Sequence, residues 1–243
     1  MAKKRLDQVL VERGLCDSRE QAKRLVLAGE VLLGTMVATK PATPVSEDAD
    51  VRVKEKPRFV SRGGLKLEGA LSAFGIDPDG KVCLDAGAST GGFTDCLLQH
   101  GARKVYAFDV GTNQLVWKLR NDPRVVSREQ FNVRHMGRED VEEPIALCVI
   151  DVSFISLTLI LGPVFEVLAK DGEVICLVKP QFEAPRDAVG KGGIVRDEAV
   201  RAGALEKIRR FVVEKSAKVW CRHIDSPISG TDGNREYLAW LKH

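Results

Sequence analysis

Four charged residues, each in a short and unusual motif, could form one reactive site. The motifs are Ser61-Arg-Gly-Gly-Leu-Lys66, Val149-Ile-Asp151, Leu177-Val-Lys179-Pro180 and Gly233-Asn-Arg-Glu236. A lysine whose pKa is lowered by burial and by a neighbouring cation can remove a proton from a weakly acidic hydroxyl group. Lys179 is the predicted base, because it ends an apolar run before a proline. Asp151 and Glu236 would orient the base. Lys66 would stabilise a developing oxyanion or hold a nearby phosphate.

A glycine-rich turn, Asp85-Ala-Gly-Ala-Ser-Thr-Gly-Gly92, lies between the first and second of these motifs. Glycine lets a backbone turn tightly and approach a ligand closely, so the turn is a candidate cofactor site. Its spacing differs from the Gly-x-Gly-x-x-Gly pattern of dinucleotide sites. It also matches the Gly-x-Ser-x-Gly nucleophile motif of α/β hydrolases, for which Asp151 and His223 could complete a triad. Both interpretations are open at this point.

Asp109 ends the apolar run that follows the glycine-rich turn. An acidic residue at such a strand end can accept hydrogen bonds from both hydroxyl groups of a ribose. It could equally cap a helix. A site for a ribose-containing cofactor is therefore one of two interpretations of Asp109.

The elements that must position these residues alternate between apolar runs and helical patterns from residue 63 onwards. Strands are predicted at 81–85, 104–109, 124–127, 146–151, 173–179, 217–224 and 236–242, with helical stretches among them, notably 156–169 and 197–215. This alternation indicates an α/β domain over residues 59–243, with a mostly parallel seven-stranded sheet covered by helices on both faces. The last two strands are joined too closely for a crossover helix, so the last strand should be antiparallel. Three of the four charged residues follow strand ends, where open α/β sheets keep their chemistry.

Residues 1–58 predict a separate, small α+β domain. Ser18 and Gln21 form a capping-box pattern at the start of one helix, and Gly14 and Gly29 are placed to end helices. Residues 1–66 carry 14 Lys and Arg against 9 Asp and Glu, whereas the whole chain has a net charge of only +3. A basic N-terminal piece on a nearly neutral body suggests an acidic partner.

Three stretches of this piece resemble the RNA-binding module of the small-subunit ribosomal protein S four. They are Arg5-Leu-Asp-Gln-Val-Leu, Ser18-Arg-Glu-Gln-Ala-Lys-Arg and Ala28-Gly-Glu-Val. The resemblance implies that the module binds structured RNA through phosphates and shape more than through sequence. The residues that it assigns to RNA binding are Arg5, Arg19, Lys23 and Arg24.

The glycine-rich turn with an acidic residue at each of two strand ends resembles S-adenosylmethionine-dependent methyltransferases of Rossmann-like fold. The resemblance implies that Phe93 flanks the cofactor and that Asn132 reaches its adenine. The full set that it assigns to S-adenosylmethionine is Asp85, Gly87, Ser89, Gly91, Gly92, Phe93, Asp109 and Asn132.

The four charged motifs resemble those of FtsJ-like ribose methyltransferases, whose catalytic set is Lys-Asp-Lys-Glu. Together with the N-terminal module, they are closer still to the TlyA family of rRNA 2′-O-methyltransferases. This resemblance covers nearly the whole chain and includes Asp151-Val-Ser-Phe-Ile-Ser and Val178-Lys-Pro-Gln-Phe-Glu. It implies that Lys66, Asp151, Lys179 and Glu236 catalyse 2′-O-methylation of cytidine in rRNA. It also implies ribosomal particles, rather than free nucleotides, as the substrate.

Other function classes can be weighed from composition. The six cysteines are scattered without a Cys-x-x-Cys pair, so neither metal sites nor disulfides are expected. There is no apolar run of about 18 residues and no signal-peptide pattern, so we expect a cytoplasmic protein with no membrane or DNA partner. Family members are often labelled haemolysins, which makes a membrane-active protein one alternative. A non-catalytic RNA-binding ribosome assembly factor is another.

Overall fold

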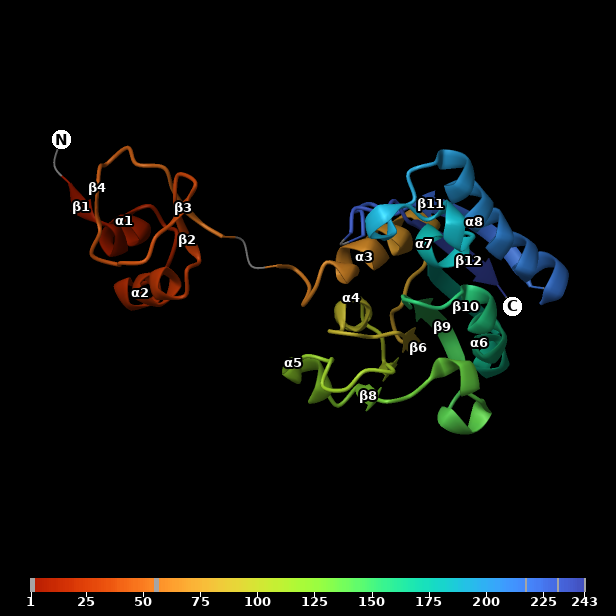
Figure 1. Cartoon of the computed structure of the whole chain (residues 1–243). Coiled ribbons are helices and arrows are strands. Elements are labelled where there is room, and N and C mark those ends of the chain that lie inside the picture. Colours follow the sequence, from red (N-terminus) through yellow and green to blue (C-terminus); the bar gives the residue numbers. More distant parts are fainter. Residues whose placement is uncertain (1–2, 55–56, 217, 231, 243) are drawn as a thin grey trace. The chain divides into compact units, whose positions relative to one another are not determined.

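The chain forms two compact units, Met1–Pro57 and Arg58–His243, in the computed structural model (Figure 1). The structure describes residues 3–54, 57–216, 218–230 and 232–242. The division lies one residue before the domain boundary that the sequence predicts. Each unit has an apolar core of its own.

The first unit contains two helices and two small antiparallel sheets in its described residues. The helices are α1 (Leu6–Glu12) and α2 (Arg19–Leu27). One sheet pairs β1 (Lys4–Arg5) with β4 (Pro44–Val45), and the other has the order β3 (Met36–Val37), β2 (Val31–Leu33) and β5 (Val51–Val53). The β1–β4 pair was not predicted, because two-residue strands carry no readable periodicity.

Polar caps determine where α2 begins. The Ser18 hydroxyl accepts a hydrogen bond from the backbone N–H of Gln21 at 3.2 Å, as the capping pattern predicts. The Gln21 side chain accepts from the N–H of Asp17, one residue earlier than a standard capping box would place it. Ala22 and Val26 then face the core, while the opposite side of α2 stays exposed.

The second unit is built on a seven-stranded sheet with the order β11-β12-β10-β9-β6-β7-β8. Only β12 runs antiparallel to its neighbours, which confirms the predicted fold class. The strands are β6 (Val82–Ala86), β7 (Lys104–Phe108), β8 (Val125–Arg128), β9 (Ile145–Ile150), β10 (Leu168–Val178), β11 (Val219–Asp225) and β12 (Tyr237–Lys242).

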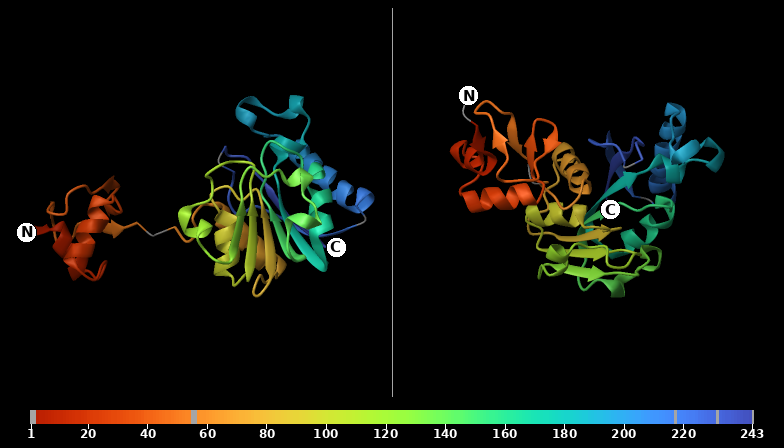
Figure 2. Two further views of the ribbon diagram at one scale, coloured as in Figure 1. Left: turned by 90° about the horizontal axis from the view of Figure 1, so that it is seen from below. Right: turned by 60° about the vertical axis from the view of Figure 1, so that its left-hand side comes forward.

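Helices cover both faces of this sheet (Figure 2). One face packs against α3 (Gly63–Phe74), α4 (Gly92–Gln99) and α5 (Trp117–Arg120), and the other against α6 (Leu161–Val167) and α8 (Glu198–Arg210). In β9, Leu147 and Val149 contribute to the first core while Cys148 and Ile150 contribute to the second. The central strands therefore read as continuous apolar runs, because neither face meets water.

Two predicted helices differ in detail from the observed ones. The stretch 156–169 begins with a 3-10 turn, Leu157–Leu159, and its α-helix starts only at Leu161. Pro163 accounts for this start, because a proline is tolerated in the first turn of a helix but not in its interior. The end of the stretch is strand, since Leu168 already pairs with Ile145. The stretch 197–215 is α8 followed by a π-helical turn at Phe211–Lys215.

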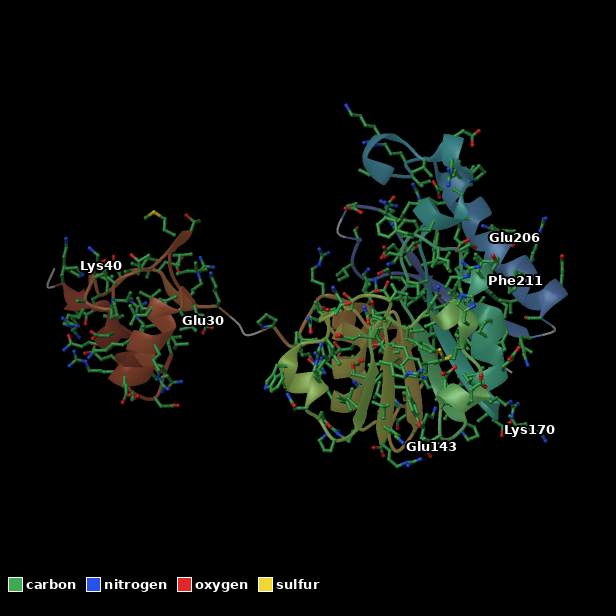
Figure 3. The ribbon with its side chains drawn as sticks, turned by 60° about the horizontal axis from the view of Figure 1, so that its bottom comes forward. Glu30, Lys40, Glu143, Lys170, Glu206 and Phe211 are labelled. Carbon is green, nitrogen blue, oxygen red and sulfur yellow. The ribbon has the colours of Figure 1, made fainter. Side chains whose placement is uncertain are left out.

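The carboxyl ends of the parallel strands define the edge of the sheet that carries the candidate site. Glu143 and Lys170, which lie near the beginnings of β9 and β10, mark the opposite edge (Figure 3). The short elements beside the site edge include α7 (Pro180–Glu183) and the 3-10 turns η1 (Val133–His135), η2 (Arg138–Asp140), η4 (Arg186–Ala188) and η5 (Lys191–Gly193).

Candidate active site

A cavity of about 820 Å³ lies at the carboxyl edge of the sheet in the second unit. All four charged residues singled out in the sequence line it: Lys66, Asp151, Lys179 and Glu236. Part of the glycine-rich turn, including Gly87 and Ser89, lines the same cavity. The folded chain thus brings the two predicted groups of residues together.

Lys66 and Glu236 form a nearly buried ion pair. The Nζ atom of Lys66 lies 2.5 Å from Oε2 of Glu236, and their side chains are 10% and 3% exposed. Lys66 comes from α3, whereas Glu236 directly precedes β12. Gly230 closes over this pair, because a Cβ atom at residue 230 would lie 2.7 Å from Glu236 Oε1.

Lys179 and Asp151 form the second ion pair in the cavity. The Nζ atom of Lys179 lies 2.6 Å from Oδ1 of Asp151 and donates a hydrogen bond to the Ser153 hydroxyl at 2.9 Å. Lys179 stands directly before Pro180, which occupies the first position of α7. The proline ends β10 there, so the lysine is presented at the edge of the sheet.

Strand register explains why residues so distant in sequence meet. Val178 is paired with Tyr237, so the residues just beyond this pair, Lys179 and Glu236, lie on neighbouring strands at the same edge. Asp151 follows β9, which runs parallel to β10 on its other side. Because β12 is antiparallel, it begins where the parallel strands end. The reversed strand thereby delivers a carboxylate to the edge where the other strands deliver their last residues.

A second cavity of about 320 Å³ adjoins the first and shares Gly87, Ser89 and Asp151 with it. Asp109 and Asn132 also line it. The Asp109 carboxylate accepts hydrogen bonds from the backbone N–H groups of Ser89 and Gly111, each at 2.7 Å. Since each carboxylate oxygen has a further lone pair, Asp109 can order the turn and still accept hydrogen bonds from a ribose diol.

The glycine-rich turn fits a close-lying ligand. Gly87 has a φ of 88°, and a Cβ atom there would lie 2.5 Å from the backbone oxygen of Asp151. At Gly91, with a φ of 98°, a Cβ atom would overlap Leu119. Gly92 packs against Ser61, and the buried Phe93 lines the larger cavity. The two cavities, the turn and Asp109 together suit the nucleoside and amino-acid parts of S-adenosylmethionine.

Asp85 lies beneath the turn with no solvent exposure. One carboxylate oxygen, Oδ2, accepts a hydrogen bond from the Thr94 hydroxyl at 2.6 Å, whereas Oδ1 is buried without a partner. Burial raises the pKa of Asp85 to about 7, against the effect of the Thr94 hydrogen bond. An unpartnered buried oxygen beneath a cofactor turn fits the cationic cofactor that the sequence predicts.

The hydrolase triad is not assembled. His223 is exposed on β11, where its ring packs near Trp220 and Tyr237, and it lines neither cavity. Ser89 has a φ of 47°, but its backbone N–H is bonded to Asp109. A serine and an acid without a histidine cannot perform the proton transfers of a triad.

The structure adds residues that the sequence reasoning missed. The buried Glu183 accepts hydrogen bonds from the Ser156 hydroxyl at 2.6 Å, the Leu157 N–H at 2.7 Å and Lys207 Nζ at 2.9 Å. It thereby ties α7, which follows Lys179, to the loop that follows Asp151. Phe154, with a φ of 64°, is exposed at the mouth of both cavities. The only sequence signal for these residues was their place in the two quoted motifs.

The most deeply buried thiols give no competing reactive site. Burial raises the pKa of Cys83, Cys96 and Cys176 to about 12, so these thiols stay protonated and unreactive. Among the described residues, we find no group of His, Cys, Asp or Glu that could hold a metal ion. No helix in the described part of the chain is long and apolar enough to cross a membrane.

In the first unit, the four residues assigned to RNA binding all have exposed side chains: Arg5, Arg19, Lys23 and Arg24. Arg5 ends β1, and the other three lie on α2. Arg5 and Arg19 pair with the buried Asp7, and all four side chains remain accessible to a ligand.

Comparisons with known proteins cover both units. A family model described as FtsJ-like methyltransferase matches residues 59–243, and one described as S4 domain matches residues 4–51. Hemolysin A of Brachyspira hyodysenteriae is 47% identical over 236 residues, which cover 97% of this chain and 98% of the relative. The 16S/23S rRNA (cytidine-2′-O)-methyltransferase TlyA of Mycobacterium tuberculosis is 45% identical over 243 residues, covering 98% of this chain and 89% of the relative.

A solved structure described as "Putative hemolysin from Streptococcus thermophilus" matches the whole chain. The match covers 100% of this chain and 89% of the chain in the solved structure, with 47% sequence identity and a TM-score of 0.75. Sequence and structure comparisons therefore agree over both units.

Replacing Asp85 by asparagine should stabilise the ligand-free protein in a pH-dependent way. The raised pKa means that ionisation of the buried Asp85 carboxyl costs no stability below about pH 4 and increasingly more up to about pH 7. The gain in unfolding free energy for Asp85→Asn should therefore grow over this range to about 4 kcal/mol. Denaturant titrations at pH 5 and pH 8 measure it, with the exposed Asp171→Asn as control. A gain that is the same at both pH values would contradict this account of Asp85.

Asp109→Ala should weaken the binding of S-adenosylmethionine by about 1–3 kcal/mol, the cost of losing a charged hydrogen-bond acceptor. Isothermal calorimetry measures the affinity, and circular dichroism checks that the variant is folded. His223→Ala, which removes the residue that only the hydrolase interpretation needs, should bind the cofactor like the unmodified protein. Unchanged affinity in a folded Asp109→Ala variant would remove Asp109 from the cofactor site.

Proposed function

The chain belongs to the FtsJ-like methyltransferase family and is an S-adenosylmethionine-dependent RNA (ribose-2′-O) methyltransferase, and we propose that it modifies cytidine in rRNA on ribosomal particles. One structural observation supports methyl transfer to a ribose hydroxyl: the ion pairs Lys66–Glu236 and Lys179–Asp151 line the same cavity as the cofactor turn. The M. tuberculosis relative, whose name specifies cytidine in 16S and 23S rRNA, supports the choice of nucleotide. The S4 domain at residues 4–51 supports binding to structured RNA.

Lys179 is the proposed general base. A ribose 2′-hydroxyl is a very weak acid, so its proton must leave at or before the transition state. Since Lys179 is charged in its ion pair with Asp151, it would first lose one proton to solvent. The neutral amine would then take the hydroxyl proton, while its hydrogen bond to Ser153 directs the nitrogen lone pair. Asp151, with Oδ1 2.6 Å from Nζ, would stabilise the ammonium group as it forms.

Lys66 is proposed to stabilise negative charge on the acceptor ribose or its adjoining phosphate. Its ammonium group is only slightly exposed, so its field is poorly screened by water. Glu236 holds that ammonium in one position through the 2.5 Å contact. A charge fixed before the reaction needs little reorganisation during it, which is the source of electrostatic catalysis.

S-adenosylmethionine, when bound, supplies the methyl group from its sulfonium. The protein's contribution is alignment. Gly87 lets the turn lie directly against the backbone of Asp151, so a ligand on the turn lies beside the Lys179–Asp151 pair. Asp109 would fix the other end of that ligand through its ribose.

Lys179→Ala should leave cofactor affinity nearly unchanged and lower the turnover number by roughly 10²–10⁴, the range for losing a general base. Lys179→Arg should not restore activity, because a guanidinium group remains protonated. Single-turnover transfer of a labelled methyl group measures the activity of both variants. Lys170→Ala is the matched control, since Lys170 is exposed at the opposite edge of the sheet (Figure 3). Full activity in Lys179→Arg would exclude Lys179 as the base.

The substrate form can be tested by offering naked rRNA and each purified ribosomal subunit with labelled S-adenosylmethionine. We expect faster transfer to at least one subunit than to naked rRNA. Faster transfer to naked rRNA would contradict the particle substrate but leave the reaction itself in place. No transfer to any of them by a protein that binds the cofactor would favour the non-catalytic assembly factor.

A further inference from the structure

In the S4 domain, the carboxylate of Asp7 is fully buried and faces two arginines that are not. Arg5 donates two parallel hydrogen bonds to it, from Nε to Oδ1 and from Nη2 to Oδ2, each 3.0 Å long. Arg19 donates from Nη2 to Oδ2 at 3.3 Å. The three residues come from β1, α1 and the first turn of α2, so one carboxylate joins the beginnings of three elements.

The three side chains differ greatly in their exposure to solvent. That of Asp7 is 0% exposed, whereas those of Arg5 and Arg19 are 44% and 52% exposed. Among the described residues, neither guanidinium group makes a hydrogen bond to any group other than Asp7. Each therefore keeps several N–H donors for a ligand, because a guanidinium group carries five.

The charge of this group suits an anion. Two guanidinium groups on one carboxylate leave a net positive charge, and both arginines are held side by side before any ligand arrives. The hydrogen bonds from Arg5 hold the pKa of Asp7 below its usual range, so the carboxylate stays charged at neutral pH. A guanidinium fork matches the oxygens of a phosphate, and fixing its rotamer in advance lowers the entropy cost of binding.

We propose that Asp7 is a positioning residue that holds Arg5 and Arg19 as a cradle for a backbone phosphate of the substrate RNA. This rests on the proposed function, which makes RNA the substrate. Lys23 and Arg24 lie further along α2, and the ion pairs of Asp7 are with Arg5 and Arg19. They add positive charge to the same helix, whereas Arg5 and Arg19 add defined geometry.

The cradle and an explanation based on charge alone predict opposite changes in RNA affinity when Asp7 is neutralised. Removing a carboxylate from an RNA-binding surface makes that surface more positive, so charge alone predicts tighter RNA binding with a steeper salt dependence. A cradle predicts weaker binding, because the two arginines lose their common anchor. A carboxylate that serves only the stability of the fold predicts neither change in a variant that stays folded.

The test compares Asp7→Asn with Glu12→Gln in the full-length protein. Glu12 lies on the same helix, pairs with Lys4 at 2.8 Å and is half-exposed, so both variants lose one negative charge. We expect Asp7→Asn to bind an rRNA fragment about tenfold more weakly, the scale for losing preorganised charged hydrogen bonds. Glu12→Gln should bind equally well or slightly more tightly. In methyl transfer, Asp7→Asn should raise KM for rRNA and leave kcat unchanged.

RNA affinity in a folded Asp7→Asn variant that equals or exceeds that of Glu12→Gln would overturn the cradle. If Asp7→Asn unfolds the S4 domain, Arg5→Lys and Arg19→Lys decide instead, because they keep both the charge and Asp7 but lose the planar fork. They should weaken RNA binding, and unchanged affinity in both would overturn the proposal. Loss of the cradle leaves methyl transfer at saturating rRNA intact, whereas failure of the proposed function abolishes transfer by the unmodified protein.

Competition separates an RNA phosphate from free phosphate. Inorganic phosphate at millimolar concentration should not displace the rRNA fragment. The RNA contacts the protein at neighbouring positions as well, and free phosphate cannot make those contacts. Displacement at that concentration would show a site for free phosphate and would contradict an RNA cradle.

Discussion

Two lysines can occupy one cavity of this protein because each is held beside a carboxylate. Removing an ammonium group from water is costly unless an opposite charge and hydrogen bonds replace the lost hydration. Glu236 does this for Lys66, and Asp151 with Ser153 does it for Lys179. The four charged residues come from four different parts of the second unit, so their pairing constrains the whole fold. Each of the elements that supply these four residues must begin or end at the same edge of the sheet.

The mixed topology of the sheet meets this constraint. The parallel strands β9 and β10 deliver Asp151 and Lys179 at their carboxyl ends. A further parallel strand would have brought its first residues to the opposite edge. The antiparallel β12 instead begins at the site, which places Glu236 there. The reversed last strand is therefore part of the candidate active site as well as a feature of the fold.

The same edge joins the charged residues to the cofactor turn. Gly87 lies so close to the backbone of Asp151 that a side chain would not fit. One residue of the turn thus touches the segment that carries one of the proposed catalytic carboxylates. Binding and chemistry are adjacent because β6 and β9 are neighbours in the sheet.

Local patterns in the sequence predicted those features of the fold that neighbouring residues in the chain determine. Apolar runs placed the strands within a few residues, and the residues following them included Asp109, Asp151 and Lys179, all of which line the two cavities. The short connection between the last two strands predicted their antiparallel pairing. The roles assigned to individual residues came from family resemblance, and they stay predictions.

What the sequence could not predict depends on contacts between distant residues. The start of β10 at Leu168 follows from its pairing with Ile145, which overrides a helical pattern. Glu183 appeared only as the end of a motif, because its partner Lys207 lies on another helix. Asp7 likewise read as an ordinary helix residue, since nothing local indicates that Arg19 reaches it.

The most direct test of the central claim is alkaline hydrolysis of rRNA that the protein has labelled with a radioactive methyl group. Alkali cleaves RNA through the free 2′-hydroxyl, so a 2′-O-methyl group protects the linkage beside it. If the tetrad methylates ribose, the label should be recovered in an alkali-resistant dinucleotide that contains cytidine. Recovery of the label in a mononucleotide would mean that a base is methylated, and the account of this cavity would be wrong.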